Sequence, residues 1–302
     1  MPRDGVFIGR SATGEGSLPS LTIPQAKGIP AKAGIQCVAN TLLTVVVVDS
    51  RFRGNDCDSA RLAVVRFLDQ MRVPAEKSDW RLMRQMFGAI APRYNFVTSV
   101  FSYGMDRRWK QTAVRKAALH DRALVLDLAC GTGDFSQLVL QSSLGTTVVA
   151  ADITRPMLEM ARQRSCCRVI CTDAMVLPFP DNLFDCVFVG YGLRNFPDLN
   201  GAIQEICRVT RRGGMLVSLD FFLPANRLWR SLYLGYLQAQ GAFWGWLLHG
   251  RPRLYTYIPD SLRGFITIED FSCLLKRMGY ARVDAHSYIS GGIGLHWAVK
   301  RA

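Results

Sequence analysis

The chain has 302 residues, of which 49% are hydrophobic, and its formal net charge is +13. This composition supports a full hydrophobic core and excludes a wholly disordered chain. The positive charge favours anionic partners, but the basic residues are scattered rather than gathered into a tract. We therefore expect a membrane-facing or solvated basic surface and no nucleic-acid partner.

The cysteines and the early apolar segments indicate the compartment. None of the nine cysteines forms a CxxC pair with a second such pair at zinc-ribbon spacing, so we expect reduced thiols and no metal site. The run Leu42–Val48 is far shorter than the ~20 residues that span a bilayer. It also lies too far from the start to belong to a secretory signal. These features predict a cytoplasmic protein.

Residues 1–70 differ in composition from the rest of the chain. They are rich in Gly, Pro, Ser and Thr and lack helical periodicity. The stretches Ile29–Gln36 and Asp49–Asp56 resemble translated bacterial intergenic repeat DNA. We interpret residues 1–70 as a disordered or non-native extension, with Met71 as the natural start, and residues 71–302 as the folded domain. A targeting leader is the alternative, although the mixture of acids and bases argues weakly against it.

The folded domain opens with helical patterns and then alternates between strands and helices. Helical spacing from Trp80 to Ile90 and over Asp106–Leu119 predicts two N-terminal helices. Five apolar runs predict strands, at Ala123–Ala129, Thr146–Ala151, Arg168–Thr172, Phe184–Val189 and Met215–Phe221.

Helices are expected between these strands and near the C-terminus. They begin at Asp134 and span Arg155–Arg164, Leu199–Arg211, which the pair Gly213-Gly214 would end, and Ile268–Met278. Two further strands, Ala281–Tyr288 and Leu295–Lys300, predict a closing antiparallel hairpin. The whole pattern predicts an α/β fold with a doubly wound, mostly parallel, seven-stranded sheet.

The turn after the first predicted strand is a candidate cofactor site. Gly131 and Gly133 let a ligand approach the backbone, but the third glycine of a dinucleotide-binding turn is missing. Asp127, on the strand itself, suits the cationic amino end of S-adenosylmethionine (SAM) better than it suits a pyrophosphate. An NAD-binding module is therefore disfavoured.

Two further strand ends carry matching groups. Asp152 closes the second strand about 20 residues beyond the glycines, where a carboxylate accepts both ribose hydroxyls. Asp173 and Ala174 follow the third strand, where a short acid or amide takes the adenine amino group. Because ligands of open α/β sheets bind at the carboxyl ends of the strands, the three acids predict one SAM site. For Asp173 alone, a solvated strand end is an equally good reading.

Two segments carry a family resemblance. Val125–Asp134 resembles motif I of class I SAM-dependent methyltransferases, which have a Rossmann-like fold. Leu177–Asp185, followed by Tyr191–Asn195, resembles the UbiE-type ubiquinone/menaquinone C-methyltransferase family, and the similarity runs from about Met86 to Lys300. The resemblance makes residues 71–302 a SAM-dependent methyltransferase domain. It implies SAM contacts at Thr132, Asp152, Asp173, Ala174 and Gly190.

The reaction that the resemblance implies is methyl transfer to a ring carbon of a polyprenyl quinol. A ring carbon becomes nucleophilic when the neighbouring hydroxyl loses its proton, so the catalyst must stabilise a phenolate. Arg194 and Asn195 are the candidate groups, although Arg194 has the alternative of simply pairing with a nearby acid. Tyr94 lies in a segment that resembles the cofactor lid of the family, and it is a third catalytic candidate that could hydrogen-bond the ring or orient a water.

Some positions of the lid segment depart from the family pattern. Asn95 stands where Asp is common, and Thr98 stands where Asn is common. If that Asp serves as a base in relatives, this chain lacks it, and its substrate or rate would differ. The following segment, Asp106–Trp109, matches the family, and we expect it to fix a helix. Tyr257 and Ser261 lie in another family segment and are further candidates for the active site.

The aromatic run Phe221–Trp246 follows the fifth strand, where this fold inserts substrate-binding elements. Basic residues flank it, namely Arg227, Arg230, Arg251 and Arg253. Such a run is often core, but Trp and Tyr beside Arg also suit a membrane interface. We expect an isoprenoid channel or a patch at the inner face of the cell membrane.

Several functions stay open at this point. The leading one is C-methylation of a polyprenyl benzoquinol or a demethylnaphthoquinol. A methyltransferase for another lipid, such as a phospholipid N-methyltransferase, would share the cofactor half. A third candidate is a non-catalytic SAM-binding assembly factor of a quinone-synthesis complex. The expected partners are the quinol, the membrane surface, and either a second copy of the chain or such a complex.

Overall fold

The computed structural model describes residues 84–302, apart from positions 85, 89, 143–144, 166 and 250–252. The chain divides between Gln70 and Met71 into two units, and every described residue belongs to the second. The interpretation of residues 1–70 and the helical positions Trp80 and Met83 lie outside the described residues.

A seven-stranded sheet forms the centre of the described domain, in the order β3-β2-β1-β4-β5-β7-β6. Its strands are β1 (Leu124–Leu128), β2 (Thr147–Asp152), β3 (Arg168–Cys171), β4 (Phe184–Gly190), β5 (Thr210–Phe221), β6 (Tyr280–Tyr288) and β7 (Ile293–Lys300). The first five strands run parallel, whereas β7 is antiparallel to both β5 and β6. The predicted doubly wound sheet with a C-terminal antiparallel hairpin is therefore confirmed.

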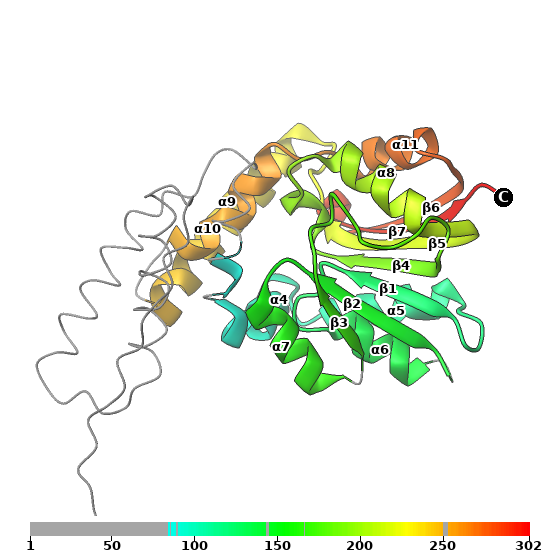
Figure 1. The fold of residues 1–302 in the computed structure, drawn as a ribbon. Coiled ribbons are helices and arrows are strands. Elements are labelled where there is room, and N and C mark those ends of the chain that lie inside the picture. The colour runs from blue at the N-terminus through cyan, green and yellow to red at the C-terminus, as the bar shows by residue number, and fades with distance from the viewer. Residues whose placement is uncertain (1–83, 85, 89, 143–144, 166, 250–252) are drawn as a thin grey trace, which may run out of the picture. The chain divides into compact units, whose positions relative to one another are not determined.

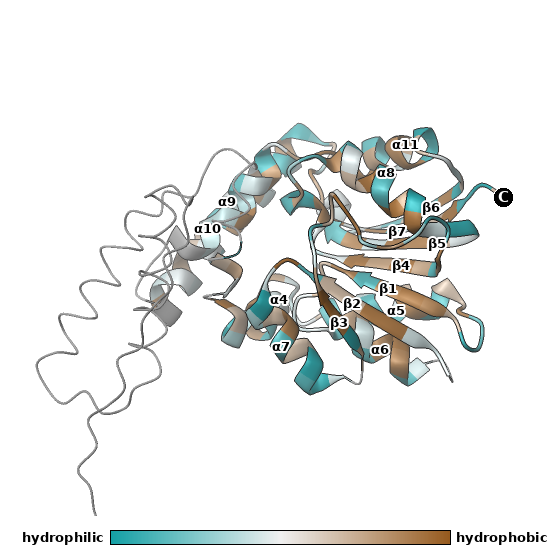
Figure 2. Ribbon diagram, viewed as in Figure 1, coloured by the Kyte–Doolittle hydropathy of each residue, from teal (hydrophilic) through white to brown (hydrophobic). Residues whose placement is uncertain are grey.

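Helices cover both faces of the sheet (Figure 1). On one face lie α5 (Asp106–Ala117), α6 (Asp134–Ser142) and α7 (Arg155–Arg164), and on the other lie α8 (Leu199–Val209) and α11 (Ile268–Arg277). The central strands are almost entirely buried and hydrophobic, as the brown ribbons of Figure 2 show. Burial on both faces is the reason why these strands read as continuous apolar runs.

The end of α8 differs from the prediction. The helix ends at Val209, and Thr210 already pairs with Phe184, so Arg211 and Arg212 are not helical. The register of β4 against β5 then shifts between Phe184 and Cys186, and Gly213 takes a φ of +69°. Gly213-Gly214 therefore forms a bulge inside a strand, because a bulge uses the same left-handed glycine conformation as a helix end.

A second helical layer surrounds the approach to the sheet. Pro92 lies in the short 3-10 helix η1 (Ala91–Arg93), which leads into α4 (Tyr94–Phe101). The aromatic run after β5 forms the long helix α9 (Arg227–His249), which packs on α10 (Arg253–Arg263). Within the described part of the chain, no helix is both long and apolar enough to cross a membrane.

Candidate active site

The glycine-rich turn between β1 and α6 is shaped by three left-handed residues, Ala129, Gly131 and Gly133, with φ of +53°, +54° and +80°. A Cβ on Gly133 would lie 3.0 Å from the Cβ of Ala161 in α7, so this glycine allows close helix packing. At Gly131 the nearest neighbour of such a Cβ would be the ring of Tyr94, at 3.5 Å. The turn therefore presents its backbone beside Tyr94.

Asp152, at the end of β2, is buried beside this turn. One carboxylate oxygen accepts a hydrogen bond from Gly131 N at 2.9 Å, and the other accepts from Thr154 N at 2.7 Å. Burial raises the pKa of Asp152, and these backbone donors oppose the rise. The carboxylate thus fixes the turn, and the remaining lone pairs of its two oxygens are the acceptors that a ribose diol requires.

Asp127 lies in β1 and is held by α6, the helix that follows the turn. Its Oδ2 accepts hydrogen bonds from the backbone N (2.8 Å) and the hydroxyl (2.6 Å) of Ser136 in α6. Burial raises the pKa of Asp127 to about 7, although Ser136 and Lys110 favour the charged form. Asp127 is therefore a carboxyl whose charge responds to a nearby cation.

The remaining predicted cofactor residues lie at neighbouring strand ends. Asp173 and Ala174 follow β3, whose Cys171 pairs with Asp152 in the parallel register, and Asp173 Oδ1 accepts from Met175 N at 2.9 Å. Asp173 is exposed and Ala174 is buried. Gly190 ends β4, and a Cβ there would lie 2.8 Å from the Phe135 ring. All three positions reach the carboxyl edge of the sheet.

Thr132 links the turn to the lid segment. Its hydroxyl donates to Asn95 Oδ1 at 2.7 Å, and Arg164 binds both the carbonyl and the hydroxyl oxygen of Thr132, at 3.0 and 2.9 Å. Thr98, the other departure from the family pattern, donates its hydroxyl to the Tyr94 carbonyl at 2.9 Å. The amide oxygen of Asn95 accepts the hydrogen bond from Thr132, as a carboxylate oxygen of Asp at this position would.

Arg194 lies in η2 (Leu193–Asn195) and is 5% exposed. Its guanidinium donates to Asp220 Oδ1 of β5 at 2.8 Å and to the Tyr191 carbonyl at 3.3 Å, and it stacks over the Phe221 ring at 5.1 Å. The pairing of Arg194 with an acid, considered above as the alternative role, is thus present. Nevertheless the Nε donor of Arg194 is buried and has no hydrogen-bond partner in the described structure.

Asp220 is the acid that the sequence analysis missed. Its two oxygens also accept the backbone N–H groups of Leu193 and Phe221, each at 2.8 Å, so one carboxylate holds the Arg194 turn against β5. An acid inside the otherwise apolar stretch Met215–Phe221 was the available signal, because a buried charge requires a partner.

Asn195 and two tyrosines complete this side of the site. The Tyr257 hydroxyl donates to Asn195 Oδ1, and Asn195 Nδ2 donates to the Tyr191 carbonyl at 3.3 Å. The ring of Phe87 makes edge contacts with Tyr94 and Tyr257, at centroid distances of 6.4 and 6.3 Å. Burial raises the pKa of Tyr94 to about 12, so its phenol is a hydrogen-bond donor at neutral pH.

A small cavity of about 40 Å³ lies between α4, η2, the end of β5 and α10. Arg194 and four tyrosines line it together with apolar side chains, and the full lining is Met86, Phe87, Ile90, Tyr94, Val97, Thr98, Phe101, Tyr191, Arg194, Phe221, Tyr255, Tyr257 and Ile258. Tyr94 therefore touches both this cavity and the glycine-rich turn. Ser261 donates its hydroxyl to the Ile258 carbonyl within α10.

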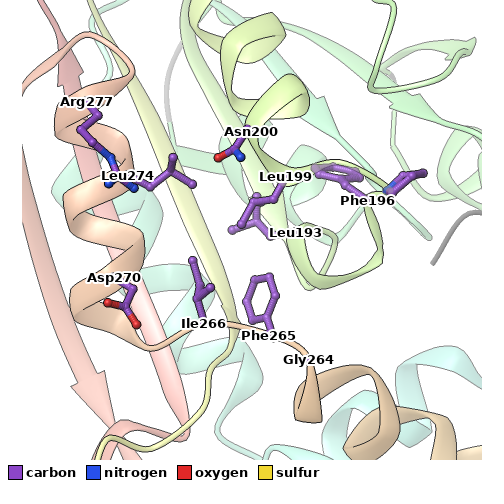
Figure 3. Close-up of a pocket in the computed structure, with 11 residues that line it drawn as sticks. Leu193, Phe196, Leu199, Asn200, Gly264, Phe265, Ile266, Asp270, Leu274 and Arg277 are labelled. Carbon is purple, nitrogen blue, oxygen red and sulfur yellow. The ribbon is translucent and has the colours of Figure 1, made fainter. Parts of the chain in front are cut away.

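A larger cavity of about 240 Å³ lies between η2, α8 and the loop before α11. Leu193, Phe196 and Phe265 face it, and Arg277 and Asn200 stand at its edge (Figure 3). It shares no lining residue with the Arg194 cavity and contains none of the predicted site residues. Size alone favours the larger cavity, whereas the converging polar groups favour the smaller one as the candidate site.

Comparisons with known proteins identify the family of the chain. A model of the ubiE/COQ5 methyltransferase family matches residues 74–300. The demethylmenaquinone methyltransferase of Thermus thermophilus is 37% identical over 201 residues, which are 65% of this chain and 91% of that protein. The ubiquinone/menaquinone biosynthesis C-methyltransferase UbiE of Desulfotalea psychrophila is 35% identical over 221 residues, which are 72% and 90% of the two chains.

Solved structures support the fold. A SAM-dependent methyltransferase from Thermotoga maritima superposes with a TM-score of 0.51 at 16% identity, covering 72% of this chain and 99% of that one. At this level of identity the comparison shows a shared class I methyltransferase fold.

We predict that Asp220→Asn destabilises the protein by about 3 kcal/mol, because the substitution leaves the Arg194 charge buried without a counter-ion. Urea unfolding measures the change in free energy. Asp181→Asn is the matched control, since Asp181 pairs with Arg208 at the surface and is 68% exposed, where an ion pair contributes about 0–1 kcal/mol. Equal effects of the two substitutions would contradict the importance of the buried pair.

Proposed function

The chain belongs to the ubiE/COQ5 methyltransferase family, and from this premise we propose that it transfers the methyl group of SAM to a ring carbon of a polyprenyl benzoquinol or demethylnaphthoquinol. The family and its curated relatives make the chain a SAM-dependent methyltransferase of quinone biosynthesis. The observation that carries the finer proposal is the position of Tyr94, which lines the Arg194 cavity and lies against the glycine-rich turn. A methyl donor and an acceptor ring held on the two sides of Tyr94 would be neighbours.

The residues of the turn suit SAM, which supplies a methyl group on a sulfonium sulfur. The backbone at Gly131 and Gly133 is open to a ligand, and Asp152 offers carboxylate oxygens for the ribose. We assign Asp127 to the amino end, Asp173 and Ala174 to the adenine, and Thr132 and Gly190 to further contacts, as in the family pattern.

The Arg194 cavity suits a ring that carries hydroxyl groups. Arg194 brings a positive charge to a lining that is otherwise apolar or phenolic apart from Thr98, and its Nε is a buried donor in need of an acceptor. A quinol oxygen would satisfy this donor, and the interaction would strengthen as the oxygen becomes negative. We therefore assign Arg194 to stabilising the phenolate, with Asn195, Tyr257 and Tyr94 orienting the ring.

The departures from the family pattern do not favour a non-catalytic role. Asn95 keeps its hydrogen bond with Thr132, and the Thr98 hydroxyl bonds within α4. Neither substitution removes a group that the described site uses. We therefore propose an active enzyme rather than a SAM-binding assembly factor.

The outer side of α9 provides a route for the isoprenoid tail. Six large apolar side chains of α9 are exposed, and their spacing along the chain places them on one side of the helix. They are Leu228, Leu232, Tyr236, Phe243, Trp246 and Leu247. Rings of α4 and of the turn after it extend this surface, because the ring centroid of Phe96 lies 5.5 Å from that of Trp244, and the Tyr103 ring stacks on Tyr236 at 5.9 Å. We name these residues together the α9 face.

The α9 face suits an anionic bilayer surface. α9 contains no Asp or Glu and begins with Arg227 and Arg230, whereas the side chains at Arg251 and Arg253 lie outside the described ones. The neighbouring helices α4 and α10 line the Arg194 cavity. We propose that the protein binds the inner face of the cell membrane through the α9 face and takes its quinol from the bilayer.

We expect the affinity for SAM to rise with pH between about 5 and 7, by up to tenfold per unit. The pKa of Asp127, about 7 in the folded protein, exceeds the 3.8 of an unfolded chain, so folded Asp127 holds its proton across this window. A bound amino cation would favour the carboxylate and release that proton. Calorimetry at pH 5.5–7.5 measures the slope, and Asp127→Asn should abolish it. An equal slope in both proteins would contradict the assignment of Asp127.

Arg194→Lys tests the catalytic assignment while keeping a positive charge beside Asp220. A point charge does not reproduce the guanidinium fork, so turnover of a short-chain quinol should fall about a hundredfold while the SAM affinity stays within twofold. Product is measured by mass spectrometry, and SAM affinity by calorimetry. Normal turnover in a variant that only melts at a lower temperature would show that Arg194 is structural.

Leu232→Glu tests the α9 face. The substitution should weaken binding to phosphatidylglycerol vesicles about tenfold or more, because it removes an apolar contact and adds a repelled charge. Val176→Glu is the matched control, since it adds the same charge at an exposed apolar residue outside the face. Co-sedimentation measures the binding. Equal binding of both variants to the vesicles would contradict the assignment of the α9 face to the membrane. Dissociation of a dimer by Leu232→Glu alone would instead assign the α9 face to a second copy of the chain.

A further inference from the structure

The lining of the Arg194 cavity contains no carboxylate and no histidine among the described residues. Ring methylation by a sulfonium releases one proton per turnover, so the proton must leave the cavity through a group that lines it. The ionisable groups available are phenols and one guanidinium. A phenol passes a proton on only when an acceptor stands behind it.

Tyr191 is held in the cavity wall at an energetic cost. Its φ is +58°, a conformation that costs a non-glycine residue about 1–3 kcal/mol. The ring packs against Phe221 at a centroid distance of 5.3 Å, and the side chain is buried. The hydroxyl is also buried; it makes no hydrogen bond of regular geometry, and the side chain that acts on it as an acceptor is Asp106. Backbone strain and an incompletely bonded hydroxyl at one residue point to a role other than stability.

A carboxylate stands beside Tyr191. Lys110 is 4% exposed, and its Nζ lies 2.8 Å from Asp106 Oδ2, 2.8 Å from Asp134 Oδ2 and 5.5 Å from the centre of the Tyr191 ring. The other oxygen of this carboxylate, Asp106 Oδ1, is buried and has no hydrogen bond of regular geometry among the described residues. Burial, and then the charge of Asp106, raise the pKa of the Tyr191 phenol well above its usual value. Tyr191 therefore stays protonated and close to an acceptor.

Tyr257 contrasts with this arrangement. Its hydroxyl donates to the amide oxygen of Asn195, which cannot take up a proton at neutral pH. This bond orients the Tyr257 hydroxyl but gives its proton no acceptor.

We propose that Tyr191 and Asp106 form a proton relay that carries the hydroxyl proton of the quinol out of the Arg194 cavity. The inference rests on the proposed function. As the ring carbon bonds to the methyl group, the carbon–sulfur bond breaks and sulfur keeps its electron pair. The quinol O–H proton passes to Tyr191 Oη, the Tyr191 proton passes to Asp106 Oδ1, and the O–H pair becomes a C=O bond.

The remaining steps restore the ring and the relay. The ring carbon that took the methyl group loses its hydrogen as a proton, and the carbonyl oxygen regains one. Asp106 gives its proton to water, so that one proton is released in total. A carboxylate can accept this proton, because a hydroxyl on a ring that has accepted a methyl cation is a strong acid. Lys110 donates to Asp106 Oδ2 and so fixes the position of the carboxylate.

Tyr191→Phe separates the relay from a structural role. Removing an unsatisfied buried hydroxyl should leave the melting temperature unchanged or raise it, while turnover of a short-chain quinol falls about a hundredfold. Tyr280→Phe is the matched control, because Tyr280 on β6 is also buried and its hydroxyl also lacks a hydrogen bond of regular geometry, with Thr210 rather than a carboxylate beside it. The control should share the thermal behaviour and keep full turnover.

Asp106→Asn completes the test. It should lower turnover as much as Tyr191→Phe, and the double variant should be no slower than the slower single variant, because both remove one relay. Turnover of Tyr191→Phe within threefold of the wild type, or additive losses in the double variant, would overturn the relay. Failure of the wild type to methylate any quinol would instead contradict the proposed function and the relay together.

Discussion

The buried ion pair between Arg194 and Asp220 is the interaction on which the site depends. It joins the turn after β4 to the end of β5, two strands that are neighbours in the sheet. Burying two charges is costly unless both are paired and further hydrogen-bonded. Asp220 meets this condition with two backbone N–H groups, so the turn has one stable position. In that position the Nε of Arg194 is buried and has no hydrogen-bond partner among the described residues.

The proposed cofactor side follows the same principle, because its carboxylates are held by hydrogen bonds from the backbone. Asp152 fixes the glycine-rich turn, and Asp127 fixes the start of α6. Asp134, bound by Lys110 and Arg164, connects α5, α6 and α7 around the turn. Because these acids are already oriented before a ligand arrives, binding requires little reorganisation.

Local patterns in the sequence were sufficient for the sheet and for the strand-end acids, because parallel strands buried on both faces are apolar and their carboxyl ends share an edge. They were insufficient where distant segments meet. The ion pair of Arg194 with Asp220 spans 26 residues, and Lys110 meets Asp134 across 24 residues. The pair Gly213-Gly214 predicted a helix end where the structure has a strand bulge, because both features use the same glycine conformation. The length of α9 had no local signal, since an aromatic run is compatible with several structures.

The position of the transferred carbon tests the central claim most directly. The purified protein is incubated with SAM labelled with ¹³C in its methyl group and with a reduced short-chain demethylnaphthoquinol or benzoquinol, and the product is examined by NMR. The account predicts a labelled methyl group bonded to a ring carbon. A label on an oxygen or nitrogen atom, or SAM that binds and is never consumed, would contradict it.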